Sequence, residues 1–530
     1  MNTPQGFSVS YKNKFLYSKY APQKAILAAV EKLSVLPGTL FLCCSPVLSY
    51  GLKELCSKLD DKSVCLLCEF DDELREFEKT QIPSDFVQLT KDELFNLPSI
   101  LNLSSYTTKS GKVLPPAGSF RRVVRIDFSA GVQLHSALYE ELTAACTNAI
   151  MTFWANRMTL VKFGRKYSQN FFRNLKLMAE TTPIQKYFGA ITKPLIVFGA
   201  GESADEGIKF LKSSDSSAFY ILCADTALQP LLANGIEPDG VFIEEAQAVI
   251  KKAFIGTQNC KTQIFAGLSA IPHLNKIKEP EKLSFFMTKY ADGKFFDDLK
   301  EKGLLPHAND PFGSVGLTAV YYALKFRASQ HVPVYIYGLD FSYSKGRTHA
   351  KGTLAHKERL LNSTKLLPVA NYAASFNQNT EGIVGKNSGV FYTTRTLKNY
   401  ANLFTGLFAK VQNLFDAGST GLELGLTHKL PEVASNTERP TATEQTTFTQ
   451  TQRAEIAEYF KNERAALEEL RDLLTGKIKL PENELKTRIT ELASPREYLY
   501  LHFPDGIRFS IDLSFLKRIR TEIDFFLKYL

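Results

Sequence analysis

The sequence predicts an α/β protein with a central doubly wound, Rossmann-like sheet of mostly parallel strands. Between about residues 191 and 430, short apolar runs alternate with segments of helical periodicity, and Gly/Pro turns separate them. This alternation is typical of a parallel sheet covered by helices. Several runs also end in glycine or an acidic residue, where open α/β sheets bind their ligands. A smaller N-terminal α/β domain and a C-terminal helical domain are expected on either side.

Length and composition limit the possible classes. A chain of 530 residues is too long for one compact core, and 44% hydrophobic with 22% charged residues is typical of a globular protein. The net charge of +9 fits both an anionic ligand and an ordinary solvated surface. No basic run with interleaved aromatic residues indicates nucleic-acid binding. No signal peptide or apolar stretch of about 20 residues is found, so we expect a cytoplasmic protein without a membrane span.

The eight cysteines do not indicate a metal site or a disulfide framework. Cys65 and Cys68 have the spacing of a metal-binding pair, but they lie in an apolar run that reads as a strand. Strand residues three apart point to opposite faces. We therefore expect buried thiols in a reducing compartment and no bound metal.

Domain boundaries follow from changes in pattern. Residues 1–136 contain a β-α-β pattern, with strands at Thr39–Cys44 and Ser63–Phe70. Residues 137–190 are expected to form a helical connector, and residues 191–430 the central domain. A Thr-rich linker at 431–452 precedes a helical domain at 453–530. The central strands are expected at Leu195–Gly199, Ala218–Ala224, Gly240–Ile243, Thr262–Ala266, Leu283–Met287 and Val332–Gly338.

The first candidate binding element is the turn after the first central strand. It reads Gly199-Ala-Gly201-Glu202-Ser203, and a helix is expected to start near Ala204. Free N–H groups at a helix N-terminus can hold a phosphate, and glycines let the backbone approach the anion. The same glycines can also serve only a tight turn. This turn is a candidate phosphate-binding site.

Acidic residues end the next two strands. Asp225 and Thr226 follow one strand, and Glu244 follows the next. A carboxylate at this edge can accept hydrogen bonds from ribose or base groups. Asp225 can equally be a helix N-cap. Both roles remain open, and we include all three residues among the candidate nucleotide or substrate contacts.

Two later segments complete the candidate site. Gly313 and Ser314 open a helix predicted at Ala319–Phe326, whose N-terminus can bind an anion or a sugar hydroxyl. The strand ending at Gly338-Leu-Asp340 is followed by a loop with Tyr343, Arg347 and His349. His349 or Tyr343 can act as a general acid or base on a hydroxyl or a leaving phosphate. The segment Asn413–Gly425 is expected to be a loop, which can close over the ligand.

Taken in order, these motifs resemble the MptE-like domain of bacterial motility-associated factors (Maf), a family of flagellin glycosyltransferases. The resemblance covers more than 200 residues, and residues 17–52 resemble the family's first domain. The family pattern has proline where Glu202 stands, and an aspartate where Glu244 stands. The motifs are Phe-Gly-Ala-Gly-Glu-Ser (198–203), Asn-Gly-Ile-Glu-Pro-Asp (234–239), Gly-Ser-Val (313–315), Gly-Leu-Asp (338–340), Thr-His-Ala (348–350) and Asn-Leu-Phe-Asp-Ala-Gly (413–418).

The resemblance implies transfer of a nonulosonic-acid, sialic-acid-like sugar from a CMP-sugar donor to Ser/Thr hydroxyls of flagellin or another protein acceptor. No cofactor is implied. It implies phosphate binding by the turn at 199–203 and nucleotide contacts from Asp225, Gly313 and Ser314. Asp340, Tyr343 and His349 would contact the donor or act as the base.

Two other functions stay open from the sequence. A pyrophosphokinase, like the family's namesake, would use ATP with Mg²⁺ held by carboxylates such as Asp225, Glu244 and Asp340. A flagellin-binding protein without enzymatic activity would suit the acid at Glu202. The oligomeric state is not predicted.

Overall fold

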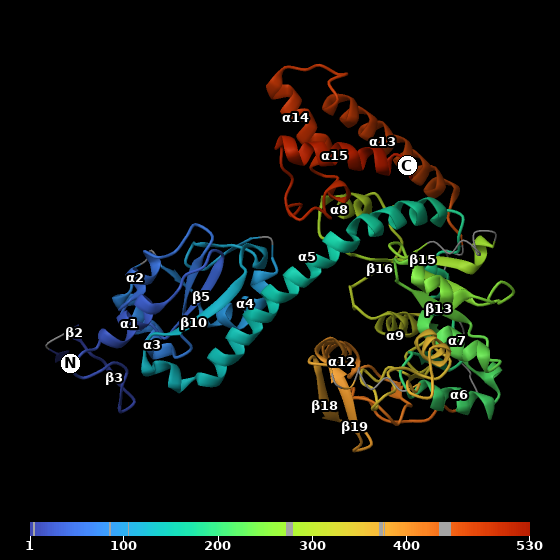
Figure 1. Ribbon diagram of the computed structural model, residues 1–530, viewed down its shortest axis with the longest axis horizontal. Helices are drawn as coiled ribbons and strands as arrows, with labels where there is room; N and C mark the ends of the chain where they lie inside the picture. Colours follow the sequence, from blue (N-terminus) through green and yellow to red (C-terminus); the bar gives the residue numbers. More distant parts are fainter. Residues whose placement is uncertain are drawn as a thin grey trace. The chain divides into compact units, whose positions relative to one another are not determined.

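The computed structural model describes residues 1–3, 6–83, 86–103, 105–271, 279–369, 375, 377–433 and 447–530. The chain separates into two compact units, residues 1–160 and 161–530. The boundary falls inside the long helix α5 (Ser136–Met178), which confirms the helix predicted from about residue 137 (Figure 1).

The first unit contains a four-stranded parallel sheet in the order β10-β5-β6-β7. Both faces of this sheet are buried, so its central strands are continuous apolar runs. Cys68 lies in the core on one face and Cys65 in the core on the other, as their spacing predicted. The strands are β5 (Thr39–Cys44), β6 (Val64–Cys68), β7 (Val87–Gln88) and β10 (Arg122–Asp127), and the helices are α1 (Lys24–Lys32), α2 (Leu52–Cys56), α3 (Asp72–Gln81) and α4 (Lys91–Leu101).

The second unit is built on an eight-stranded parallel sheet in the order β16-β15-β14-β13-β12-β11-β17-β20. The chain enters at β11, runs outward through β16, and returns to place β17 on the other side of β11. This reversal makes a topological switch point between β11 and β17, and it confirms the predicted doubly wound class. The strands are β11 (Leu195–Phe198), β12 (Tyr220–Ala224), β13 (Gly240–Ile243), β14 (Gln263–Gly267), β15 (Leu283–Thr288), β16 (Ala308–Asn309), β17 (Val334–Tyr337) and β20 (Leu414–Asp416).

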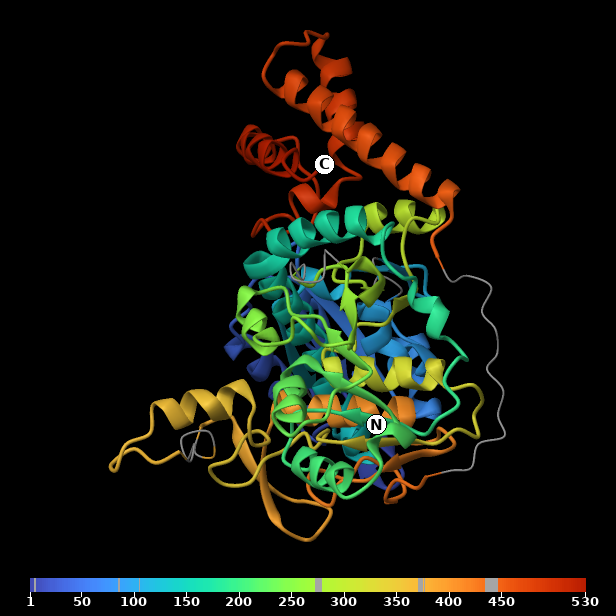
Figure 2. The same ribbon diagram turned by 90° about the vertical axis from the view of Figure 1, so that its right-hand side faces the viewer.

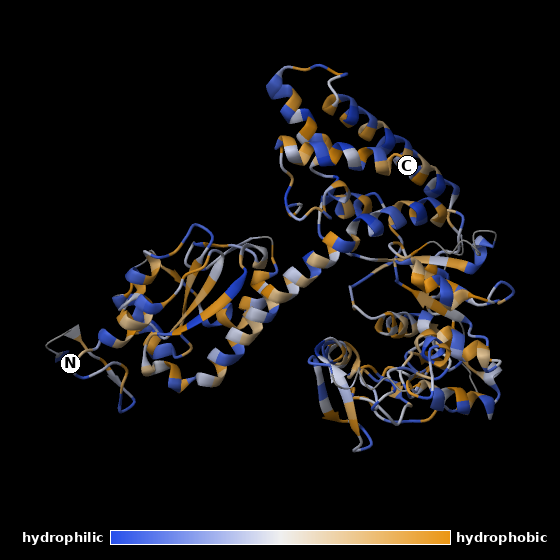
Figure 3. Cartoon of the chain, in the orientation of Figure 1, coloured by the Kyte–Doolittle hydropathy of each residue, from blue (hydrophilic) through white to orange (hydrophobic). Residues whose placement is uncertain are grey.

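Helices cover both faces of this sheet. On one face, α9 (Val315–Phe326) packs against β11, β12 and β13, and α12 (Arg395–Phe408) adds Phe404 and Phe408 to the same hydrophobic cluster. On the other face lie α6 (Ala204–Lys212) and α7 (Asp225–Ala233) (Figure 1). The central strands of both sheets are mostly hydrophobic (Figure 3). This two-sided burial explains why the strands could be predicted from apolar runs.

One segment differs from the sequence prediction, and the structure adds elements in a second segment for which none were predicted. Asn413–Gly425 is not only a loop, because Leu414–Asp416 forms the edge strand β20 beside β17. After β17 the chain makes a long excursion through α10 (Leu354–Leu361) and a hairpin of β18 (Thr380–Val384) and β19 (Val390–Thr394). This excursion, gold in Figure 2, projects from the sheet.

The C-terminal helices belong to the second unit and dock on α5 and α8 (Lys294–Glu301). Phe172 of α5 contacts Phe460, Tyr498 and Phe526, which fixes the helical domain through an aromatic cluster. Most of the predicted linker (434–446) lies outside the described residues. In the described part of the chain, no helix meets the length and hydrophobicity that crossing a membrane requires. The helices are α13 (Gln450–Leu474), α14 (Glu482–Ala493) and α15 (Leu513–Phe526).

Candidate active site

The glycines at the ends of β11 and β17 bring two chain segments into direct contact. The Gly199 N–H donates to the Tyr337 carbonyl at 2.7 Å, and the Gly201 N–H donates to the Gly338 carbonyl at 2.8 Å. A Cβ at Gly199 would lie 2.2 Å from the Gly338 carbonyl oxygen. A Cβ at Gly201 would lie 2.5 Å from Oδ2 of Asp340. The glycines of the predicted phosphate-binding turn are therefore required by the packing of the switch point itself.

Asp340 places its carboxylate on this turn. Its Oδ2 accepts the N–H of Ser203 at 2.9 Å, and its Oδ1 accepts the Ser203 hydroxyl. Ser203 Oγ also accepts the Gly338 N–H at 2.7 Å. Both side chains are buried, and burial raises the pKa of Asp340 to about 7. The N–H and the hydroxyl of Ser203 therefore donate to Asp340, although the sequence predicted that this turn binds a phosphate.

A loop and a lysine close over Asp340. Lys386, in the turn of the β18–β19 hairpin, forms a buried ion pair with Asp416 at the end of β20. A Cβ at Gly421 would lie 2.7 Å from the Asp340 Cα, so the loop after β20 packs directly on it. Asp340, Lys386 and Asp416 are therefore in contact with protein groups at the ends of β17 and β20.

The buried carboxyl of Asp340 predicts a pH-dependent stability. Its pKa is 3.8 ordinarily and about 7 in the fold, so the folded chain binds more protons in this interval. Its contribution is fully present below pH of about 4 and is lost as the pH rises through about 7, at most about 4 kcal/mol in all. Denaturant titrations at about pH 5 and about pH 8 should show this loss, and Asp340→Asn should shrink it. An equal pH difference in the variant would contradict this role of Asp340.

Glu202 is neutralised beside the glycine turn. Its Oε1 accepts the N–H and the hydroxyl of Ser344 at 2.5 and 2.6 Å. Arg347 lies 3.9 Å from the other carboxylate oxygen and pairs directly with Asp205 of α6. Glu202 therefore belongs to a network of hydrogen bonds and ion pairs with Ser344, Arg347 and Asp205.

Glu244 joins three elements at the carboxyl edge of the sheet. Its Oε1 accepts the hydroxyl of Thr288 from β15 at 2.6 Å, and its Oε2 accepts the hydroxyl of Thr318 from α9 at 2.8 Å. Removal from water raises its pKa. Asn309, at the end of β16, donates to Thr288 at 3.1 Å. Four sequence-distant polar side chains thus form one network above β13, β15 and β16.

Asp225 lies at the neighbouring strand end, as the first residue of α7. It is 5% exposed, and its Oδ1 accepts the Thr226 hydroxyl at 2.9 Å. Burial, with smaller contributions from the charges of Glu245 and Glu244, raises its pKa to about 6. No cation among the described residues forms an ion pair with it. Asp225 is therefore a basic carboxylate suited to accept a hydrogen bond or a proton from a hydroxyl.

The start of α9 completes this edge. Ser314 is the N-cap residue, and its side chain makes no capping hydrogen bond. Gly313 has φ +72°, and a Cβ there would lie 2.8 Å from the ring of Tyr400. Because Thr318, one turn later, bonds Glu244, the first turn of α9 lies at the same edge as that acid. Its N–H groups favour an anion or a hydroxyl oxygen.

Tyr343 and His349 have different surroundings on the segment after β17. Tyr343 pairs with Tyr392 of β19 through two backbone hydrogen bonds of 2.8 and 2.9 Å, and it faces the hairpin. His349 is followed by Ala350, whose N–H donates to the Ala200 carbonyl at 2.9 Å. Burial and the charge of Arg359 lower the pKa of His349. The structure thus ties His349 to the glycine turn and Tyr343 to the hairpin.

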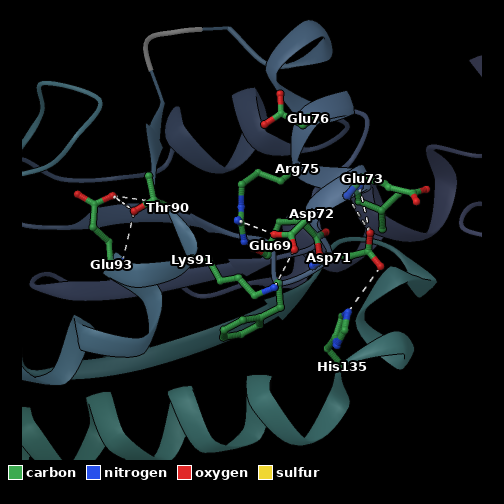
Figure 4. Close-up of polar contacts among 12 residues, drawn as sticks. Glu69, Asp71, Asp72, Glu73, Arg75, Glu76, Thr90, Lys91, Glu93 and His135 are labelled. Atoms are coloured by element: carbon green, nitrogen blue, oxygen red, sulfur yellow. Dashed lines mark hydrogen bonds and ion pairs between the residues drawn. The ribbon is translucent and has the colours of Figure 1, made fainter.

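The carboxyl edge of the first unit's sheet carries a separate group of acids (Figure 4). Glu69, at the end of β6, is buried and accepts the hydroxyls of Ser45 and Tyr139 at 2.6 and 3.1 Å. Asp71 caps α3, pairs with Lys12 at 2.9 Å and lies 3.6 Å from His135. These bonds are internal to the domain and hold its strand ends together.

Three comparisons show what the chain is similar to. Residues 169–346 match the family model described as 6-hydroxymethylpterin diphosphokinase MptE-like. An uncharacterised protein of Treponema pallidum (strain Nichols) is 32% identical over 559 residues, covering 100% of this chain and 94% of that protein. The Maf glycosyltransferase of Magnetospirillum magneticum AMB-1 has the same fold, with a TM-score of 0.55 and 14% identity over 98% of this chain and 89% of that chain. The chain therefore belongs to one family with the Treponema pallidum protein, carries an MptE-like domain at residues 169–346 as its motifs predicted, and shares its fold with a Maf glycosyltransferase.

Proposed function

We propose that this protein is a glycosyltransferase that moves a nonulosonic-acid sugar from a CMP-sugar to serine or threonine hydroxyls of flagellin. The observation that carries the proposal is the buried carboxylate of Asp225 at the carboxyl end of β12, next to the strand end where Glu244 bonds the first turn of α9. The MptE-like domain at residues 169–346 and a fold like that of a Maf glycosyltransferase support it.

In the reaction, an acceptor hydroxyl attacks the anomeric carbon, the bond from that carbon to the phosphate oxygen breaks, and CMP leaves with the electron pair. The site must therefore bind the donor and remove the proton of the acceptor hydroxyl. Asp225 takes the hydroxyl proton, since its raised pKa makes it a stronger base than an exposed aspartate. The first turn of α9, with Ser314, binds donor oxygens, and Glu244 fixes that turn through Thr318. Asp340 supports the fold in this scheme.

The pyrophosphokinase alternative would use Mg²⁺ held by carboxylates, for which Asp225, Glu244 and Asp340 are the candidates. Both oxygens of Asp340 bond Ser203, and both oxygens of Glu244 bond threonine hydroxyls. These bonds commit two of the three acids to neighbouring side chains. The geometry favours the transferase over this alternative.

We expect the purified protein to release CMP from a CMP-nonulosonic acid and to add the sugar's mass to flagellin. Asp225→Asn should reduce turnover about 100-fold or more, because an amide cannot accept the proton. Asp292→Asn is the matched control, since its side chain is fully exposed. Chromatography of CMP and mass spectrometry of flagellin measure both. Turnover of Asp225→Asn equal to that of the control would contradict the role of Asp225.

A further inference from the structure

The segment from Lys345 to Arg359 concentrates positive charge next to the glycine turn. It holds five lysines and arginines, and its one acid, Glu358, pairs with Lys252 at 2.9 Å. The segment starts at the carboxyl edge after β17 and is fastened there by the Ala350–Ala200 hydrogen bond. An excess of cations at the ligand edge of a parallel sheet suits an anionic ligand.

Among the residues that the structure describes, Arg359 is the arginine of this segment without an acid partner. Arg347 pairs with Asp205, and Lys357 donates to Gln229 of α7 at 3.0 Å. No carboxylate in the described ranges forms an ion pair with Arg359, which is half-buried and donates to the Thr348 hydroxyl at 2.5 Å. A half-buried guanidinium has remaining N–H donors that favour an oxyanion.

The Thr348 hydroxyl connects Arg359 with His349. Arg359 can only donate, so the Thr348 oxygen accepts from it. Nδ1 of His349 lies 3.0 Å from the same oxygen, and either atom can be the donor there, because a hydroxyl oxygen can accept two hydrogen bonds. When the Thr348 hydroxyl donates, Nδ1 accepts and the neutral imidazole carries its hydrogen on Nε2.

His356 faces a backbone donor. Its Nδ1 accepts the backbone N–H of Gly352 at 3.2 Å, so its Nε2 carries the hydrogen. Burial lowers the pKa of His356, and the charges of Arg347, Arg359 and Lys351 lower it further. Arg359 likewise lowers the pKa of His349. Both imidazoles therefore lie within the field of one guanidinium, and His356 carries an Nε2–H donor.

We propose that Arg359, His349 and His356 bind a phosphate group of the nucleotide donor, with His349 acting as a hydrogen-bond donor and not as a base. The proposal rests on the proposed function and deepens it. A guanidinium matches a phosphate with two parallel N–H bonds, and each imidazole adds one N–H. The same donors suit the departing phosphate of CMP, while proton removal is left to Asp225.

The test compares CMP with cytidine, which lacks the phosphate, by calorimetric titration. The wild-type protein should bind CMP more tightly than cytidine. Arg359→Met should weaken CMP binding about 10- to 100-fold and leave cytidine unchanged, with Arg359→Lys between them. Arg508→Met, an exposed arginine of the C-terminal domain, is the control. Equal affinities of wild type and Arg359→Met for CMP would overturn the proposal. Loss of free nonulosonic-acid binding instead would assign Arg359 to the sugar carboxylate and overturn it too.

A second readout separates this inference from the proposed function. Histidine NMR of the full chain, assigned with His349→Gln and His356→Gln, should show both imidazole pKa values rising when inorganic pyrophosphate is added. The rise should vanish in Arg359→Met. If pyrophosphate has this effect while CMP does not bind, the result supports the phosphate site and contradicts the proposal that the donor is a CMP-sugar. If CMP binds and neither imidazole responds to either anion, the result contradicts the phosphate site and supports a CMP-sugar donor.

Discussion

Gly199→Ala should destabilise the second unit by about 3 kcal/mol or more, because the new methyl group has no space. Its Cβ would lie 2.2 Å from the Gly338 carbonyl oxygen and 2.6 Å from a methyl carbon of Leu339. The carbonyl belongs to backbone that also receives the Gly201 N–H, so it cannot move without breaking the switch point. Urea denaturation followed by circular dichroism measures the loss.

Gly406→Ala is the matched control for this substitution. Gly406 lies within α12, and nothing approaches its Cβ position within 4 Å. Alanine there should leave the stability unchanged or raise it by about 1 kcal/mol, since glycine is unfavourable inside a helix. Equal stability of Gly199→Ala and Gly406→Ala would show that the ends of β11 and β17 do not meet as described.

Lys386→Met should cost about 3–5 kcal/mol, because it leaves Asp416 buried without its cation. Burial already raises the pKa of Asp416 and Lys386 opposes that rise, so without the lysine the carboxyl takes up a proton at higher pH. The loss of stability should therefore be larger at about pH 8 than at about pH 5. Denaturant titration at both pH values measures it.

The double variant Lys386→Met with Asp416→Asn gives the control. Removing the charge of Asp416 removes the need for a cation, so the second substitution should recover part of the loss and flatten its pH dependence. A double variant as unstable as the sum of the two single variants would mean that the two side chains act independently.

Most of the fold could be predicted from the sequence because parallel strands buried on both faces are continuous apolar runs. Thr39–Cys44 and Gly240–Ile243 are strands with the predicted bounds. The strand β20 was missed because Leu414–Asp416 is only three residues long and is followed by a glycine-rich loop. Its place beside β17 depends on pairing across a long excursion, which local periodicity does not report.

The sequence predicted which strand ends carry the candidate side chains, but it did not predict the hydrogen-bond partners of those side chains. Strand ends at Asp225, Glu244 and Asp340 follow from the topology, but the partner of Asp340 is Ser203, 137 residues away. Thr288 and Asn309 also end strands, so the same rule applied to β15 and β16 would have found them. No local signal marks Lys386 or Arg359, because each acquires its role from side chains brought near by the fold.

The roles assigned to the glycine turn and to Glu202 remain predictions for ligand binding. What the structure adds is a second reason for these residues to be present. Gly199, Gly201 and Ser203 hold β11 against β17, and Glu202 holds Arg347 and Ser344. A glycine-rich turn after a strand therefore does not by itself distinguish phosphate binding from close packing.

The most direct test of the central claim is a calorimetric titration of the full chain with CMP and, separately, with ATP plus Mg²⁺. We expect the protein to bind CMP and Ser314→Trp to abolish this binding, because the indole would cover the first turn of α9. We expect no comparable binding of ATP with Mg²⁺. Tight binding of ATP with Mg²⁺ and none of CMP would contradict the transferase and favour the pyrophosphokinase. Binding of neither nucleotide would also contradict the transferase and favour a flagellin-binding protein without enzymatic activity.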